Sequence, residues 1–244
     1  MIRFNATDTT NADVGFLKQV LSAVVAAGAG EVSISDLTGT AIPGAMAYIG
    51  REAVSVAGVP VRIHCHNDFG LALANTLAAV EAGATIVDGT INGLGERTGN
   101  VSLDELIAAL EFLYGIDTGV DIKRLTELSR MLEEMTGVAV PKGKPIVGRY
   151  AFAHTLDAHA MGVVAHPELY ELIDPSLEGN EGVVVLGKGS GPKGVRFRLR
   201  RLGIEATDEQ VARLVEAVNK TASATRSAVT DDELRRLVKE KSGL

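Results

Sequence analysis

The chain has 244 residues, of which 46% are hydrophobic and 23% charged, and its net charge at pH 7 is −7. This composition is typical of a globular protein, and the negative charge argues against nucleic acid or an anionic membrane surface as the main partner. The single cysteine, Cys65, excludes an internal disulfide framework. Because we find no signal peptide and no apolar run of about 18–20 residues, we expect a cytoplasmic protein.

Residues 1–117 alternate short apolar strands with alanine-rich helices, a pattern typical of parallel βα units. Pro43 suits the start of the second helix, because a first helical position needs no N–H donor. Ser102 or Asn100 is a candidate cap for the fourth helix. Strands are expected at residues 2–6, 31–35, 61–66 and 85–91, and helices at residues 12–27, 43–56, 71–82 and 103–114. Four such units fit either a small doubly wound sheet or half of an eight-stranded barrel.

The pattern changes after residue 117. We expect a linker helix and loop over residues 118–148, because apolar side chains recur at helical spacing from 122 to 135. Residues 149–244 are expected to form helical accessory subdomains. Within them, helices are predicted over most of 149–172, over 208–221 after Thr207, and over 231–239 after Thr230, whereas 174–194 is predicted to be glycine-rich and irregular with a strand-like run at 183–186.

The third predicted strand ends in two histidines one residue apart, His64 and His66. Strand side chains alternate between the two faces, so both imidazoles project from one face and can share a divalent ion. The loop after the next strand carries three glycines that allow a tight fold, and it can bring Asn100 or Glu96 to the histidines. The alternative is a pair of interior histidines with ordinary hydrogen-bond partners.

At this point the sequence resembles a known family. Residues 64–75 (HCHNDFGLALAN) and 93–100 (GLGERTGN) resemble motifs of the homocitrate synthases and 2-isopropylmalate synthases, which are metal-dependent TIM-barrel acyltransferases. Residues 150–154 (YAFAH), 167–175 (PELYELIDP) and 185–188 (VLGK) are similar to the linker subdomains of the same family. The resemblance therefore extends over nearly the whole chain.

The resemblance also implies a fold. Residues 3–8 (RFNATD) resemble the fifth barrel strand of the family, which implies the C-terminal half, strands 5–8, of a (β/α)₈ barrel followed by a mainly helical linker region. The missing half would supply a carboxylate ligand for the metal and an arginine that polarises the keto group. We expect it on a partner subunit, as in the two-subunit homocitrate synthases, within a hetero-oligomer that dimerises through the linker region. A shortened piece of a longer protein is the alternative.

The resemblance assigns the metal ligands and the acid–base groups. His64 and His66 would bind Mg²⁺, Mn²⁺ or Zn²⁺, with Asn100 as a weaker ligand, and the ion would act as a Lewis acid on a 2-oxo acid. His159 and Tyr170 would assist deprotonation of the acetyl-CoA methyl group in a neighbouring protomer; alternatively they are a surface histidine and a packing tyrosine. Glu96 is a catalytic candidate, unless it and Arg97 only position the glycine loop.

Three further residues are candidates for substrate binding: Arg3, Thr38 and Asn92. Arg3 would pair with a distal carboxylate of the substrate, although a surface arginine is an equal alternative. Several segments depart from the family pattern. Residues 5–8 (NATD) replace Ser-x-Glu-Asp, residues 36–39 (DLTG) replace Asp-Thr-Val-Gly, residues 156–158 replace Ser-Gly-Ile, and Gly189 stands where a histidine is common. These changes leave the identity of the 2-oxo acid open.

We therefore expect one subunit of a split acyltransferase that condenses acetyl-CoA with a 2-oxo acid, and 2-oxoglutarate is the leading substrate. Two alternatives remain from the sequence. One is a non-catalytic structural or regulatory subunit of such a synthase, and the other is a related acyl-CoA lyase. The Gly95-Glu96-Arg97 segment favours the synthases, because the lyase relatives usually carry a cysteine there.

Overall fold

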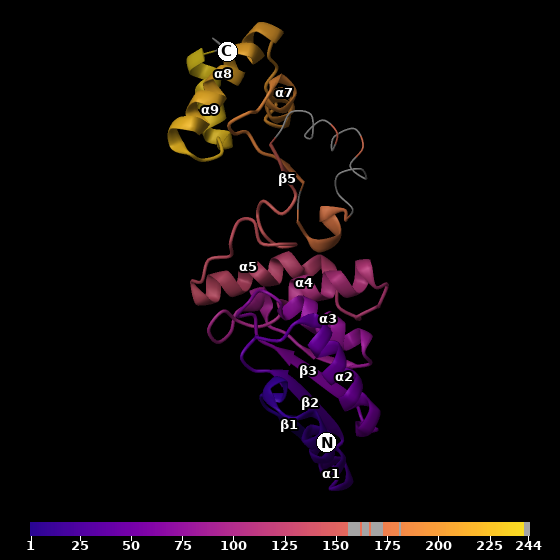
Figure 1. Cartoon of the computed structure of the whole chain (residues 1–244). Coiled ribbons are helices and arrows are strands. Elements are labelled where there is room, and N and C mark those ends of the chain that lie inside the picture. The colour runs from indigo at the N-terminus through magenta and orange to yellow at the C-terminus, as the bar shows by residue number, and fades with distance from the viewer. Residues whose placement is uncertain (156–161, 163–165, 167–172, 181, 242–244) are drawn as a thin grey trace. The chain divides into compact units, whose positions relative to one another are not determined.

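The computed structural model describes residues 1–155, 162, 166, 173–180 and 182–241. The chain divides into two compact units, which are treated separately below (Figure 1). The first unit contains residues 1–121 and 127–140, and the second contains residues 122–126 and 141–244. The boundaries expected near residues 117 and 148 remain a prediction. In the described part of the chain, each helix is either too short or too polar to span a lipid bilayer.

The first unit is built on a four-stranded parallel sheet whose strands follow one another in chain order (Figure 1). The strands are β1 (Arg3–Ala6), β2 (Glu31–Asp36), β3 (Val61–Cys65) and β4 (Ile86–Asp88). All three strand pairs are parallel, as the βα pattern predicts. The fourth strand is shorter than expected. The chain leaves the sheet after Asp88 and forms a 3₁₀ turn, Ile91–Gly93, in which Asn92 has a φ of 59°.

Four helices follow the strands: α1 (Val14–Ala26), α2 (Pro43–Ala57), α3 (Ala72–Glu81) and α4 (Leu103–Ala108), the last continued by a π-helical turn, Ala109–Leu113. The Asp13 side chain caps α1 by accepting a hydrogen bond from the Phe16 N–H at 2.8 Å, and Pro43 occupies the start of α2. Ser102 is the N-cap residue of α4, but its side chain makes no capping hydrogen bond.

The two faces of this sheet differ in character because strand side chains alternate. Alternate residues such as Ile34 and Ile63 are fully buried and form the core together with helix residues such as Leu21 and Met46. The residues between them are polar and lie on the opposite face. They include Arg3, Asn5, Ser33, Ser35, Arg62, His64 and Asp88. The candidate site lies on this polar face.

The linker helix is observed as a 3₁₀ turn, Ile122–Arg124, followed by α5 (Leu125–Thr136), close to the expected helix at 122–135. The second unit contains β5 (Ala153–His154), which pairs in parallel with β6 (Val183–Val184). Three helices, α7 (Pro192–Arg201), α8 (Asp208–Thr225) and α9 (Asp231–Lys241), share a separate core that includes Leu199, Leu214 and Leu234.

Two predictions for the second unit were wrong. Residues 149–155 are not helical, and residues 153–154 form a strand, because they pair with a strand about thirty residues later that local periodicity does not reveal. Most of the rest of the stretch 149–172, which was expected to be mostly helical, lies outside the described residues. Helix α7 was missed, because the glycines before it made the region resemble a loop; Pro192 is in fact its first residue. The two C-terminal helices and the strand near residue 183 are confirmed.

Candidate metal centre

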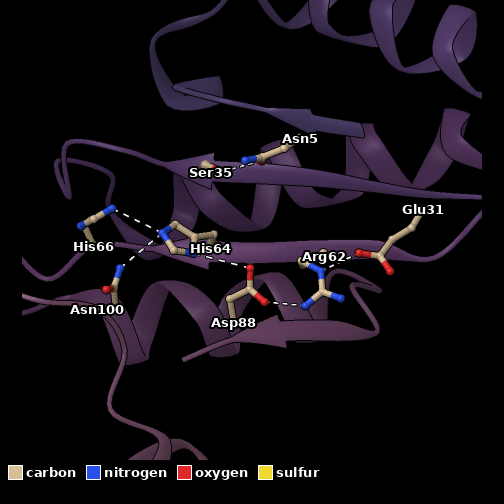
Figure 2. Close-up of polar contacts among 8 residues, drawn as sticks. All are labelled: Asn5, Glu31, Ser35, Arg62, His64, His66, Asp88 and Asn100. Atoms are coloured by element: carbon tan, nitrogen blue, oxygen red, sulfur yellow. Dashed lines mark hydrogen bonds and ion pairs between the residues drawn. The ribbon is translucent and has the colours of Figure 1, made fainter. Parts of the chain in front are cut away.

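Strand β3 places both imidazoles of the His-x-His pair on one side of the sheet, as predicted. The Nε2 atoms of His64 and His66 lie 3.3 Å apart (Figure 2). Cys65, between them, points into the core, where it is fully buried. Burial raises the pKa of the Cys65 thiol to about 12, so the thiol stays protonated and is not a metal ligand at neutral pH.

The glycine loop brings Asn100 to the same point, as predicted. The Asn100 backbone pairs with that of His66, and its Nδ2 lies 3.3 Å from His64 Nε2. This fold needs small residues: a Cβ at Gly95 would lie 2.2 Å from Asn100 Oδ1, and one at Gly99, where φ is 90°, would lie 1.8 Å from the Gly93 carbonyl oxygen. The three glycines thus permit the approach of Asn100.

The arrangement fits a divalent ion. Two imidazole nitrogens, each about 2.1 Å from one ion, are about 3.3 Å apart when the angle at the ion is roughly 100°. A rotation of the Asn100 amide by half a turn places its oxygen where its nitrogen lies, and this oxygen is a further possible ligand for the ion. Burial, followed by the charges of His64 and Arg97, lowers the pKa of His66 and favours the neutral imidazole, which is the form that binds metal.

The chain supplies only part of a coordination shell. Among the described residues, no three His, Cys, Asp or Glu side chains are grouped to hold an ion. The donor set observed is therefore two imidazoles and one amide, which leaves coordination positions free. The Nδ1 atom of His66 is buried and has no hydrogen-bond partner in the described structure.

Arg97 joins three loops around this site. Its guanidinium donates to both carboxylate oxygens of Asp68, at 2.7 and 2.9 Å, and to the Leu37 carbonyl at 2.7 Å. Asp68 follows β3, Leu37 follows β2, and Arg97 itself follows β4 in the left-handed backbone region, with a φ of 58°. The hydrogen bonds from Arg97 lower the pKa of Asp68. Arg97 therefore positions the loops, whereas its neighbour Glu96 is exposed.

A chain of charged side chains extends from His64 along the polar face of the sheet, on the side away from His66 (Figure 2). Asp88 Oδ2 lies 3.6 Å from His64 Nδ1, Asp88 Oδ1 pairs with Arg62, and Arg62 Nε donates to Glu31 Oε1 at 2.5 Å. None of these three charged residues was predicted. The available signal was the strand alternation itself, because Arg62 lies two residues before His64.

A shallow cavity of about 210 Å³ adjoins His64 on the same face. Seven of its eight lining residues are of polar or charged types: the lining consists of Arg3, Asn5, Thr7, Ser33, Ser35, Leu37, His64 and Asp88. Arg3 and His64 therefore border one space, which is consistent with a substrate that reaches from one to the other.

The structure does not bring Thr38 or Asn92 into the group formed by His64, His66 and Asn100. Thr38 is exposed, with its hydroxyl 2.9 Å from that of Thr40. The Asn92 side chain is hydrogen-bonded to Ser129 of α5. Its Nδ2 donates to the Ser129 carbonyl oxygen at 3.0 Å, and its Oδ1 accepts from the Ser129 hydroxyl at 2.5 Å. His159 and Tyr170 lie outside the described residues. The roles proposed for these four residues stay predictions.

Two family models match the chain. The model described as HMGL-like matches residues 1–132, and the model described as homocitrate synthase post-HMGL domain-like matches residues 146–226. The first match covers the sheet and the histidine pair, and the second covers most of the second unit.

Curated relatives carry related names. The chain is 45% identical to a probable 2-isopropylmalate synthase of Methanopyrus kandleri, over 90% of this chain and 44% of that protein. It is 41% identical to the homocitrate synthase AksA of Methanothermobacter thermautotrophicus, over 99% of this chain and 62% of that protein. The chain thus spans about half the length of the curated relatives that it matches.

Among solved structures, the HMG-CoA lyase of Bacillus subtilis is similar with a TM-score of 0.51 and 24% identity. The similarity covers 57% of this chain and 51% of the lyase chain. At this identity it supports the α/β fold with a parallel sheet and carries no information about activity.

Proposed function

The chain belongs to the HMGL-like family, and we propose that it forms the metal-binding part of an acyl-CoA:2-oxo acid acyltransferase of the homocitrate synthase and 2-isopropylmalate synthase type. The observation that carries the proposal is the convergence of His64, His66 and Asn100 at 3.3 Å separations at the carboxyl end of a parallel sheet. Active sites of parallel α/β folds lie at this end of the strands.

We also propose that the sheet is half of a (β/α)₈ barrel whose other half is carried by a partner subunit in a hetero-oligomer. Helices pack on its apolar face, and its polar face lines a cavity, as the interior of a divided barrel would. Large apolar side chains are exposed on the helices that flank both edges, Phe16 of α1 (62% exposed) and Leu113 after α4 (75%). The partner would cover these side chains and supply a carboxylate ligand for the ion.

Each part of the site has a distinct proposed task. His64, His66 and Asn100 would hold Mg²⁺, Mn²⁺ or Zn²⁺, which supplies Lewis-acid polarisation of a keto group when bound. His159 and Tyr170 would assist removal of a proton from the methyl group of acetyl-CoA in the active site of a neighbouring protomer, and the imidazole of His159 suits this role because imidazoles titrate near neutral pH. Glu96, on the glycine loop, remains a catalytic candidate. The whole reaction would take place in the cytoplasm.

The cavity favours a 2-oxo acid with a polar distal group. Seven of its eight lining residues are polar or charged, so a branched apolar chain would leave their hydrogen-bonding groups without partners. Arg3, which lines the same cavity as His64, would bind a distal carboxylate. The proposed substrate is therefore 2-oxoglutarate, with Thr38 and Asn92 shaping the surrounding loops.

The test uses the chain co-purified with a protein that carries the other barrel half. Release of free CoA thiol from acetyl-CoA is measured against a panel of 2-oxo acids, with and without a chelator. We expect chelator-sensitive condensation, fastest with 2-oxoglutarate, and at least a hundredfold loss on His64→Ala. The control is Glu52→Gln, which changes a carboxylate that pairs with Lys18 on the helix layer and should leave turnover unchanged.

Two results would overturn the proposal. Turnover unaffected by His64→Ala would indicate a structural or regulatory subunit. Cleavage of an acyl-CoA adduct without any condensation product would indicate an acyl-CoA lyase.

A further inference from the structure

We propose that Asp88 is a positioning residue that fixes His64 in the tautomer with its proton on Nδ1, so that the Nε2 lone pair faces the metal position. Arg62, braced by Glu31, fixes Asp88 in turn. This inference rests on the metal site of the proposed function, and it concerns only residues of this chain.

The strand register creates the contact. His64 of β3 and Asp88 of β4 are paired neighbours in the sheet, and their side chains lie on the same polar face, with Asp88 Oδ2 3.6 Å from His64 Nδ1 (Figure 2). The second oxygen, Asp88 Oδ1, accepts a hydrogen bond from Arg62. The carboxylate is thus divided, with one oxygen toward the imidazole and the other toward the guanidinium.

The chemistry of the pair selects one tautomer. A neutral imidazole has one N–H donor and one lone-pair nitrogen, and an ionised carboxylate only accepts. Asp88 therefore favours the proton on Nδ1 of His64, which leaves the lone pair on Nε2. That atom faces His66 Nε2 and the Asn100 amide, each at 3.3 Å. In other proteins, carboxylates that accept a hydrogen bond from the second ring nitrogen orient metal-binding histidines in the same way.

Arg62 fixes the orientation of the side chain at position 88 by donating a hydrogen bond to it. Its Nε donates to Glu31, which is only 3% exposed, and the other side of its fork holds Asp88. A guanidinium only donates, so it requires an acceptor oxygen at residue 88. An asparagine at this position would give its oxygen to Arg62 and turn its NH₂ toward His64, thereby donating to Nδ1 and favouring the proton on Nε2.

Two-bond ¹H–¹⁵N correlation NMR of the ring nitrogens distinguishes the two tautomers of His64. It is recorded on the metal-free chain at about pH 8, well above the ordinary pKa of imidazole. The His64 signals are assigned by their loss in His64→Gln. We expect predominantly Nδ1–H in the wild type, a mixture in Asp88→Ala, and predominantly Nε2–H in Asp88→Asn. Glu52→Gln, which alters a similarly exposed ion-paired carboxylate, is the matched control and should resemble the wild type.

If the role of Asp88 is merely structural, Asp88→Ala should change the His64 tautomer more than Asp88→Asn does, or neither variant should change it. Either outcome would overturn the inference. Zinc titration of the same samples separates this result from the proposed function. Asp88→Asn should weaken Zn²⁺ binding by about 10–100-fold. A wild-type chain with the expected tautomer but without zinc binding, even with the partner half present, would refute the metal site and leave the tautomer result intact.

Discussion

At the scale of single residues, Gly95 is the position at which an added side chain would meet the candidate ligand Asn100 directly. An added Cβ would lie 2.2 Å from Asn100 Oδ1, so Gly95→Ala must displace the Asn100 side chain from the two imidazoles. We expect the affinity for Zn²⁺, measured by competition with a chromogenic chelator, to fall about tenfold or more. The fold should persist, because the loop is at the surface.

The matched control for this variant is Gly44→Ala. Gly44 lies in the first turn of α2, and an added Cβ there meets nothing within 4 Å. Zinc affinity should be unchanged in this variant. Equal affinities for Gly95→Ala and the wild type would show that Asn100 contributes nothing to metal binding.

The sequence predicted part of the site at this scale. His64, His66 and Asn100 were predictable because strand alternation and a glycine loop act over short stretches of chain. Asp88 was not, because its role depends on the register between β3 and β4, and β4 was expected to continue to residue 91. Once β4 ends at Asp88, the carboxylate stands beside His64. The side chain of Asn92 is likewise engaged by a helix more than thirty residues away.

At the scale of elements, helices α8 and α9 begin with the same reciprocal cap but differ in one ionisable group. Thr207 pairs with Gln210 at the start of α8, and Thr230 pairs with Glu233 at the start of α9. Hydrogen bonds from Thr230 to the carboxylate lower the pKa of Glu233. Its contribution to stability is therefore complete above the ordinary glutamate pKa and is lost as the pH falls through the lower folded value.

This difference predicts two pH profiles. Glu233→Ala should lower the free energy of unfolding by roughly 0.5 kcal/mol at pH 7, and the difference from the wild type should shrink below about pH 4.5. Gln210→Ala, which removes a neutral partner, should cost a similar amount at every pH. Urea unfolding followed by circular dichroism between pH 3 and 7 measures both. A pH-independent cost for Glu233→Ala would contradict the prediction.

Elements with local signals were predictable from the sequence. The helices α1, α2, α8 and α9 have capping residues or proline at their starts, and the predicted starts lie within two residues of those observed. The strand β5 carries no such signal, because a two-residue strand is defined by its partner β6. The π-helical turn at Ala109–Leu113 was also not predicted, since its apolar spacing is that of an ordinary helix.

At the scale of the whole molecule, the parallel order of β1 to β4 was predictable because consecutive βα units place consecutive strands side by side. The closing of such a sheet into a barrel is not contained in the order of its strands. It depends on which segments cover the polar face, and in this protein the charges on that face and the family favour a barrel.

The two hydrophobic cores make a separate prediction for the molecule. Ile34 is fully buried in the core of the first unit and Leu214 in that of the second. Because the two clusters share no residue, Ile34→Ala should destabilise the first unit and Leu214→Ala the second, each by about 2–5 kcal/mol. Hydrogen exchange followed by mass spectrometry would show faster exchange confined to the strands β1–β4 and their helices in the first variant, and to α7–α9 in the second. Faster exchange throughout the chain in either variant would show instead that both units unfold as one cooperative body.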